Sequence, residues 1–464
     1  MMLPAIEELD NLSRTELIAL VKQLIGAVQQ LQAKVARLEA DLARDHQPPP
    51  TSRNSSQPPS RDQKTNRLSK RRRRRGARPG HTRAGRALVA APDQVIEAPV
   101  LQCGRCQADL RGVSPCAVVR RQITELPEIR PVVIETRQPA VVCPACQHLE
   151  RGVLPPGLEA TRVFGPRLAA TVVYLKPEQH LSYERLTQLC HDLFGMAVRE
   201  GGATAILQRA GAAAQPAAAA IGVQVCQSPV IGSDETSARV AGHNWWQWVF
   251  LSVVGIYYLI RPSRGAKVIA EVMGEQRAQC WVCDCFSAQL TAPAERVRLC
   301  LAHQLRDLQR LIEQRPRLPW ARALQALFRT AIHLWKRRGE LSPQGYTRRV
   351  TEVERRLDRL LARRVQGAEA KRLWERYCLH REHLLVFLRY PGVPPDNNAC
   401  ERALRPSVIH RKVTNGFRSE WGAHAYAALA TIIETAKLQG RSVFDTLVKL
   451  MGPPVLTFVA PQNP

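Results

Sequence analysis

The sequence contains no run of apolar residues that approaches the roughly 20 needed to cross a membrane. Its first ten residues, MMLPAIEELD, are acidic and lack the basic segment with which a secretory signal peptide begins. These two absences exclude an integral membrane protein and argue against secretion. We therefore expect a cytoplasmic protein without a membrane partner.

Acidic residues are scarce relative to basic ones. The 464 residues include 67 Lys and Arg but only 40 Asp and Glu, which gives a formal charge of +27. A protein this basic is typical of those that bind a polyanion, and nucleic acid is the leading candidate. Ribosomal, RNA-binding and DNA-processing functions all agree with this charge.

The 13 cysteines are too few for a disulfide scaffold in a chain of this length. Two Cys-x-x-Cys pairs, Cys103/Cys106 and Cys143/Cys146, instead indicate a metal site, because each tight turn places two thiolates on one face. Two such turns complete the tetrahedral shell of one structural Zn²⁺, and short alternating stretches between them favour strands. Residues 93–155 are therefore predicted to form a zinc ribbon, with redox chemistry and chance pairing as alternatives.

Residues 13–45 predict one helix, which opens with the capping-box pattern of Ser13 and Glu16. Two apolar series repeat every seven residues: Val21, Val28, Val35 and Leu42 in one, and Leu17, Leu24, Leu31 and Leu38 in the other. This pattern favours a parallel two-stranded coiled coil. Residues 11–45 are therefore predicted to be a zipper that forms a homo-oligomer; an amphipathic helix packed on its own chain is the alternative.

Residues 46–92 differ in composition from the rest and are predicted to be a disordered linker, rich first in Pro and Ser and then in Arg. Between 61 and 90 there are 12 Lys or Arg and one Asp, a net charge of +11. Five consecutive arginines repel one another and resist burial: Arg71, Arg72, Arg73, Arg74 and Arg75. We expect this arm to contact DNA phosphates, although a solubilising tail is the alternative.

Residues 156–222 show helical periodicity in RLAATVVYLK and YERLTQLCHDLF. A helix-turn-helix unit and plain helical packing both fit this segment.

Residues 223–455 have an α/β pattern. Three strand candidates precede a helix and a fourth strand: 230–240, 245–255 and 256–262, then 265–274, then 279–286. This order predicts the opening of a ribonuclease-H-like sheet. Cys280, Cys283 and Cys285 fall in the fourth strand, where we expect small apolar core residues rather than another metal site.

Asp234 lies at the end of the first strand candidate and Asp284 near the end of the fourth. If the two strands are neighbours, these carboxylates come together, and cations must occupy the space between them. Two Mg²⁺ ions (or Mn²⁺) bound there would serve an in-line phosphoryl displacement. The alternative is that each Asp is an isolated surface or capping residue.

The segment VPPDNNACERALRPSVIHRKV supplies a third carboxylate. Asp396 is placed to cap a helix, on which Glu401 is the predicted third metal ligand. Four side chains share one face at helical spacing: Asn397, Asn398, Glu401 and Arg405. Arg405 and Lys412 are predicted to touch a phosphate. A buried polar network is the alternative role for the two asparagines.

Several motifs occur in one order that resembles the large catalytic transposase of the insertion-sequence-66 family. They are TSRNSSQPPSRD, GARPGHTRAGR, the paired cysteines, FGPRLAATVVYLKPEQHLSYERLTQLCHDLFG, GSDET, CLAHQLRDL and PPDNNACERALRP. The resemblance runs from about residue 12 to 450.

The resemblance implies an Asp-Asp-Glu triad at Asp234, Asp284 and Glu401, with a helical insertion at about 296–392. It also implies a Cys-x-x-His motif in which His303 orients DNA or a ligand, or simply packs. One departure is that family members follow the second Asp with Gly-Tyr, where this chain has Cys-Phe.

Together these patterns predict a multidomain α+β protein: coiled coil, basic arm, zinc ribbon, helical segment and ribonuclease-H-like catalytic domain. Our hypothesis is a nucleoid-associated DNA transposase that binds terminal inverted repeats and target DNA, nicks the strand and transfers it. The resemblance suggests accessory proteins encoded by the same element. The alternatives are a non-catalytic DNA-binding protein and a nuclease of the same fold.

Overall fold

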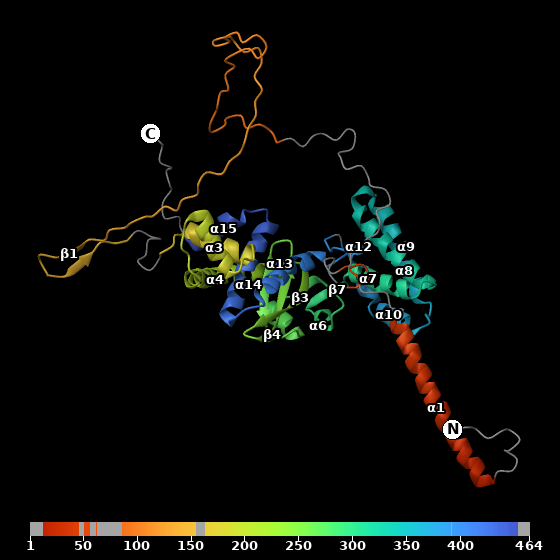
Figure 1. Ribbon diagram of the computed structural model, residues 1–464. Helices are drawn as coiled ribbons and strands as arrows, with labels where there is room; N and C mark the ends of the chain where they lie inside the picture. Colours follow the sequence, from red (N-terminus) through yellow and green to blue (C-terminus); the bar gives the residue numbers. More distant parts are fainter. Residues whose placement is uncertain are drawn as a thin grey trace.

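The computed structural model describes residues 13–45, 51–55, 62, 86–154, 163–390 and 392–452. Its body is a mixed β-sheet between two groups of helices, and the N-terminal helix extends away from it (Figure 1). This arrangement confirms the predicted α+β class. Arginines 71–75 lie outside the described residues. Among the helices that are described, none combines the length and the apolar character needed to cross a bilayer.

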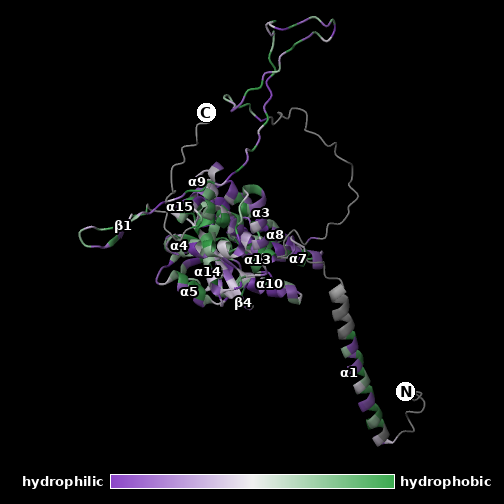
Figure 2. Ribbon diagram, turned by 60° about the vertical axis from the view of Figure 1, so that its left-hand side comes forward, coloured by the Kyte–Doolittle hydropathy of each residue, from purple (hydrophilic) through white to green (hydrophobic). Residues whose placement is uncertain are grey.

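The N-terminal helix α1 (Arg14–Asp45) is continuous, as its heptad pattern predicts. The apolar positions described along it face solvent: Leu17 is 38% exposed, Val28 51% and Leu31 61%. Figure 2 shows apolar and hydrophilic residues alternating along this helix. Self-association of α1 stays a prediction.

A five-stranded sheet forms the centre of the body, in the order β5-β4-β3-β6-β7. Its strands are β3 (Val230–Val240), β4 (His243–Leu251), β5 (Ile256–Arg261), β6 (Ala278–Cys283) and β7 (Ala294–Leu299). β3 pairs antiparallel with β4 and parallel with β6. The predicted succession of three strands, a helix (α5, Ala266–Met273) and a fourth strand is therefore confirmed.

The fifth strand was not predicted, and it corrects the start of the helical insertion. β7 pairs parallel with β6 at the edge of the sheet, and the first insertion helix begins only at Leu301. Its sequence, AERVRL, carries charged residues at three of six positions, so it lacks the apolar run of a buried strand. Residues 296–299, placed in the insertion by the sequence, thus belong to the sheet.

Alternation along β3 assigns its side chains to two faces. Ala238 and Val240 pack with α13 (Asn398–Thr414) and α14 (Glu420–Leu438). Ile231 points to the opposite face, into a core shared with α5. The sheet is therefore covered by helices on both faces.

The helices that precede the sheet in the chain pack against the helices at the C-terminal end of the described chain. They are α2 (Pro166–Val173), the π-helix η3 (Tyr174–Glu178), α3 (Tyr183–Phe194) and α4 (Glu200–Cys226). They share one core with α14 and α15 (Val443–Met451). The boundary expected at residue 222 lies inside α4, which continues through Pro216 and packs on β5.

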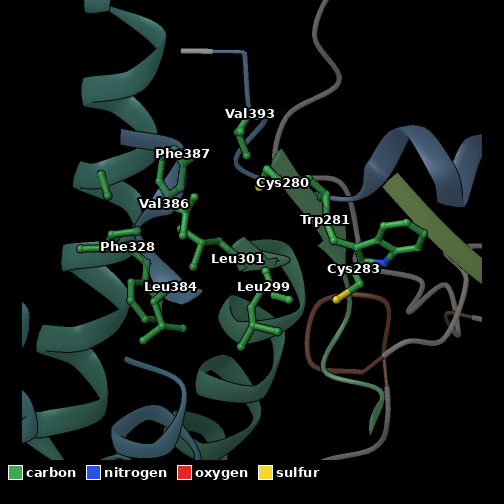
Figure 3. Close-up of a cluster of buried hydrophobic side chains, with 14 of the residues drawn as sticks. Cys280, Trp281, Cys283, Leu299, Leu301, Phe328, Leu384, Val386, Phe387 and Val393 are labelled. Carbon is green, nitrogen blue, oxygen red and sulfur yellow. The ribbon is translucent and has the colours of Figure 1, made fainter. Parts of the chain in front are cut away.

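Short and long helices fill the insertion between β7 and α13. They are α7 (Leu301–Gln314), α8 (Pro319–Lys336), the 3₁₀ turn η4 (Arg338–Glu340), α9 (Pro343–Leu361), α10 (Ala368–Leu379), α11 (Arg381–Leu384) and α12 (Val386–Arg389). Their core is continuous with the sheet: Cys280 and Cys283, buried as predicted, belong to the same cluster as Phe328 and Phe387 (Figure 3). Cys285 is half-buried against this cluster.

Candidate active site

Asp234 and Asp284 come together where β3 and β6 run side by side. The two strands are parallel, with Gly232 opposite Val282, so Asp234 and the residue that follows β6 lie near one another. By alternation Asp234 shares the face of Gly232, which α13 covers. The sequence-based expectation that these carboxylates are neighbours is met by the fold.

The surroundings of Asp234 disfavour its negative charge. Burial, together with the carboxylates of Asp284 and Glu235, raises the pKa of Asp234 to about 7. The N–H of Glu235 donates to Asp234 Oδ1 at 2.9 Å and opposes part of this effect. A cation between Asp234 and Asp284 would relieve the repulsion that burial intensifies.

Glu401, the predicted third carboxylate, contacts two basic side chains of α7. Its Oε1 lies 3.5 Å from His303 Nε2, and its Oε2 lies 3.5 Å from Arg306 Nη2. Oε1 is buried and accepts no hydrogen bond. Burial opposes a charge on His303, but contact with Cys300 and the charge of Glu401 raise its pKa to about 9. The carboxylate therefore lies between two cations at neutral pH.

The predicted catalytic carboxylates thus form a pair and a separate third member. In the part of the chain that the structure describes, no three His, Cys, Asp or Glu side chains are grouped closely enough to hold a metal ion. Arg306 was not predicted to take part in the site. The motif CLAHQLRDL places it three residues after His303, on the same side of a helix, and this spacing was the available signal.

Asn397 joins the start of α13 to β3 and to the N-cap of α7. Its side chain is 2% exposed; Nδ2 donates to the carbonyl of Ser233 at 2.9 Å, and its N–H donates to Cys300 Sγ at 3.1 Å. The close approach requires glycine at 232, because a Cβ there would lie 2.8 Å from Cys400 Sγ. For Asn397, the buried polar network is therefore the observed role.

The rest of the predicted α13 stripe is more exposed. Asp396 was predicted to cap the helix, but the N-cap is Asn397; Asp396 lies one residue earlier, and its Oδ1 accepts the N–H of Asn398 at 3.1 Å. Asn398 is half-buried, whereas Arg405 and Lys412 are exposed. A phosphate contact by these two cations stays a prediction.

Glu235 is a site residue that the sequence reasoning missed. It points to the face opposite Asp234, where its side chain is 2% exposed. Arg264 Nε donates to its Oε1 at 2.9 Å and Gln289 Nε2 donates to its Oε2, while Ser233 Oγ donates to Gln289 Oε1 at 2.7 Å. This network ties the turn that carries Asp284 to β3. Strand alternation next to Asp234 was the only signal for it.

The same network accommodates the departure at Cys285 and Phe286. The Arg264 guanidinium lies 4.2 Å from the centre of the Phe286 ring, a cation–π contact. The N–H of Phe286 donates to Asp284 Oδ1 at 2.9 Å. The aromatic ring is therefore used in packing, and the backbone of this residue holds the carboxylate.

The two Cys-x-x-Cys pairs form turns of one type. In the first, the N–H of Gln107 donates to the carbonyl of Cys103 at 2.9 Å, and Gln107 has a φ of 63°. In the second, Gln147 donates to Cys143 at 2.8 Å with a φ of 60°. The second turn joins β1 (Ala140–Val142) to β2 (Leu149–Arg151).

Within each turn the two thiols differ in exposure and acidity. The first thiols, of Cys103 and Cys143, are half-buried, whereas the second thiols, of Cys106 and Cys146, are exposed. The backbone N–H of Cys106 lowers the pKa of Cys103, and that of Cys146 lowers the pKa of Cys143 in the same way. Each pair therefore has the local form of half a metal site.

The two halves are not assembled into one site, which differs from the sequence-based expectation. Since no three potential ligands are grouped among the described residues, Cys103 and Cys106 lie apart from Cys143 and Cys146, and each turn carries only its own two thiols. Of the strands expected between the pairs, only β1 forms, directly before Cys143; residues 113–139 form none.

Comparisons with known proteins identify a family for the part of the chain that contains the sheet and its carboxylates. The model of the family described as Transposase IS66 family matches residues 161–425, more than half of the chain. Residues 3–87 match the model of a family of unknown function (DUF6444).

Two curated relatives come from Sinorhizobium fredii. The uncharacterized protein y4qI is 40% identical over 73 residues, which are 16% of this chain and 14% of that protein. The uncharacterized protein y4jO is 28% identical over 158 residues, 33% of this chain and 47% of that protein. The chain thus covers less than half of either relative. The family match spans the sheet, the insertion and all three carboxylates, and the chain belongs to the IS66 transposase family.

Proposed function

We propose that this chain is a DNA transposase that binds the terminal inverted repeats of its element and joins them to target DNA. Asp234, Asp284 and Glu401 serve as its catalytic carboxylates. The observation that carries this proposal is the convergence of Asp234 and Asp284 between parallel strands, with the pKa of Asp234 raised to about 7. The strand order, three antiparallel strands followed by two parallel ones, supports a ribonuclease-H-like catalytic domain.

Magnesium fits the donor set of this site. Carboxylate oxygens are the ligands that Mg²⁺ prefers, and Glu401 Oε1 is buried without a hydrogen-bond donor. Two bound Mg²⁺ or Mn²⁺ ions would neutralise phosphate charge and favour an ionised nucleophile. Glu401 has to leave His303 and Arg306 before it can join the aspartate pair.

The chain's own residues would direct two phosphoryl transfers. Asp234 and Asp284 would hold the cations that neutralise the scissile phosphodiester; water attacks its phosphorus, and the leaving group is the 3′-oxygen of the element end. The freed 3′-hydroxyl then attacks a phosphodiester of the target, and the target's 3′-oxygen leaves. His303 and Arg306, once released from Glu401, are placed to meet phosphate oxygens.

The test uses Asp284→Asn, which keeps the shape of the side chain and removes its charge. We expect the variant to bind duplexes with the element end as tightly as the unaltered chain. Nicking and joining in Mg²⁺ should fall at least about 100-fold, the scale of losing an electrostatic stabiliser of the transition state. Glu295→Gln, on the exposed edge of β7, is the matched control and should keep full activity. Unchanged joining by Asp284→Asn would show that the assignment of this carboxylate is wrong.

A non-catalytic DNA-binding protein is the second candidate, favoured by the separation of Glu401 from the aspartate pair. It predicts that the unaltered chain binds ends but neither nicks nor joins them. A nuclease of the same fold predicts nicking without joining. Analysis of the products formed on a supercoiled substrate distinguishes the three.

We also propose that the paired cysteines bind one structural Zn²⁺. Binding would draw the turn of Cys103 and Cys106 to that of Cys143 and Cys146, so metal and local folding would be coupled. The lowered pKa of Cys103 and Cys143 supports this, because zinc binds thiolates. Metal analysis should show one zinc per unaltered chain and none in Cys143→Ser.

A further inference from the structure

The net charge of the chain is concentrated in two segments. The arm at 61–90 carries +11, and the helical insertion at 301–390 carries +12, from 21 Lys and Arg against nine Asp and Glu. The remaining 344 residues together carry only +4. The insertion therefore carries about as much net charge as the arm, over three times as many residues. Because it is folded, its charges have fixed positions.

The acidic side chains of the insertion do not neutralise this excess. Six of the nine lie within 4.0 Å of a Lys or Arg of the same segment: Asp307, Glu340, Glu352, Glu354, Asp358 and Glu375. Of the 21 Lys and Arg, 14 have no carboxylate within that distance among the described residues. The excess of positive charge is thus available to a ligand.

In α8 the available cations form one stripe. Arg322, Arg329 and Lys336 are exposed and seven residues apart, which places them on one side of the helix at intervals of about 10 Å. The opposite side of α8 is buried, with Leu327 and Phe328 in the core. The stripe therefore faces away from the body of the insertion.

In α9 a second stripe has the same spacing. Arg348 and Arg355 are exposed and seven residues apart, on the side opposite the buried Val350, Val353 and Leu357. α8 and α9 pack as an antiparallel pair, with Trp320 Nε1 donating to the carbonyl of Leu360 at 3.0 Å (Figure 1).

The insertion is fixed relative to the candidate active site. The apolar cluster that contains Trp281 and Leu299 of the sheet continues through Leu301 to Phe328 and Phe387 of the insertion (Figure 3). DNA held on α8 and α9 would therefore keep a defined position relative to Asp284, which follows β6 directly.

Residues 51–55 bring the start of the basic arm to the same unit. Asn54 is 2% exposed, and its Nδ2 donates to Oε2 of Glu313 in α7 at 2.6 Å. The N–H and Oγ of Ser52 donate to the carboxylate of Asp62, at 2.7 and 2.6 Å. The start of the basic arm is thus attached to α7 of the insertion.

We propose that the outer faces of α8 and α9 bind the phosphate backbone of duplex DNA. The inference rests on the proposed function only in taking DNA as the substrate. An 18-residue helix such as α8 is about 27 Å long, which spans about eight base pairs of a duplex. Single strands would require exposed aromatic side chains for stacking. On α8 and α9 the aromatic side chains are instead buried (Trp320, Phe328) or half-buried (Trp335, Tyr346). Contacts of this kind position DNA without reading its sequence.

The test replaces four exposed cations in the full-length chain, as Arg322→Gln, Arg329→Gln, Arg348→Gln and Arg355→Gln together. Dissociation constants are measured over a series of KCl concentrations for a duplex with the element end and for a scrambled duplex. Each lost phosphate contact makes the slope of log Kd against log[salt] shallower by about 0.9, so a change of up to about 3.6 is expected. Affinity should fall equally for both duplexes.

The matched control removes the same charge outside the insertion, at four exposed arginines: Arg167, Arg277, Arg418 and Arg441. It should leave the slope unchanged. An equal loss in both variants would show a general effect of net charge, and a loss confined to the element end would show base recognition; either result overturns the proposal. So does an unchanged slope in the insertion variant at an unchanged denaturation midpoint.

An assay of DNA nicking and joining distinguishes a failure of this inference from a failure of the proposed function. The insertion variant keeps all three carboxylates, so it should still nick and join ends at low salt and saturating DNA. If the unaltered chain binds duplexes with the expected slope but neither nicks nor joins, the proposed function fails and the insertion surface stands.

Discussion

Glu401 and His303 face each other across the first turns of two helices, with 3.5 Å between carboxylate Oε1 and imidazole Nε2. A cationic imidazole at a helix N-terminus is unfavourable on its own, whereas a carboxylate there is favourable. Glu401 therefore offsets the charge that α7 carries at its start. The contact also means that a metal ion has to compete with His303 for this carboxylate.

This competition predicts tighter metal binding when His303 loses its charge. The positive charge of the His303 imidazolium also lowers the pKa of Asp234. We expect His303→Gln to lower the Kd for Mg²⁺ about threefold to tenfold, on the scale of one screened like-charge repulsion. Titration of the full-length chain with Mg²⁺, followed by calorimetry, measures the change.

His333→Gln is the matched control, because His333 is exposed in α8. It should leave the Kd for Mg²⁺ unaltered. Weaker Mg²⁺ binding by His303→Gln would instead mean that the imidazole holds Glu401 in the binding arrangement.

The raised pKa of Asp234 predicts that the metal-free protein loses stability as pH rises. The folded-state pKa of about 7 exceeds the ordinary Asp value of 3.8, so the folded chain binds the proton more tightly than the unfolded chain. Ionisation therefore costs nothing below pH 3.8 and reaches its full effect above pH 7, on the order of 4 kcal/mol at most. Denaturant unfolding in EDTA across this range measures the loss.

Asp234→Asn isolates this contribution. The amide does not ionise, so the variant should lose less stability between pH 4 and pH 7 than the unaltered chain. Parallel pH profiles for the two proteins would contradict the pKa shift of this residue.

The sheet and the aspartate pair were predictable because each rests on local pattern. Strand periodicity located β3 and β6, and a parallel neighbour relation was enough to bring Asp234 to Asp284. The position of Glu401 was not predictable in the same way. It depends on how α13 packs against α7, whose contacting residue His303 is 98 positions earlier in the chain.

The paired cysteines show the same division between local and long-range structure. Spacing alone predicted each turn, and both turns form as expected around Cys106 and Cys146. Their assembly depends on contacts across about 40 residues whose apolar side chains, such as Val119 and Ile123, are exposed and form no core that joins the turns. The spacing of the cysteines could therefore not determine it.

The missed strand β7 has a different cause. Arg298 is 0% exposed near the end of this strand, paired in register with Val282. A charged residue is almost never fully buried without a partner, so Arg298 interrupts the apolar pattern by which a buried strand is identified. The resemblance and the Arg- and Leu-rich composition of the following residues placed the segment in the helical insertion instead. The buried Arg298 is an exception to this rule about charged residues, and for this reason β7 was not predicted from the sequence.

Arg298 itself predicts a stabilising substitution. Its three guanidinium nitrogens are buried without a hydrogen-bond partner among the described residues, and burial lowers its pKa to about 10. The ring of Phe387 lies 5.5 Å from the guanidinium carbon. Arg298→Met keeps the length of the side chain and removes the charge, so the free energy of unfolding should rise by about 1–3 kcal/mol. Urea unfolding at neutral pH measures it.

Arg296→Met is the control on the same strand, because Arg296 is exposed and lies over the ring of Tyr390 at 4.5 Å. It should be neutral or slightly destabilising. Destabilisation of more than about 1 kcal/mol by Arg298→Met would mean that buried water or a thiolate pairs with the guanidinium.

The exposed apolar stripe of α1 predicts that the chain is a dimer through this helix. Leu24 and Leu31 occupy the same heptad position and are 40% and 61% exposed, which leaves the stripe without cover from the described part of the chain. Leu24→Lys with Leu31→Lys places like charges in the seam of a coiled coil and should give a monomer by light scattering. The matched control is Gln23→Lys with Gln30→Lys, which adds the same charge on the outer face of the helix, away from the seam, and should stay dimeric. A dimer that survives the leucine substitutions would place the self-association elsewhere in the chain.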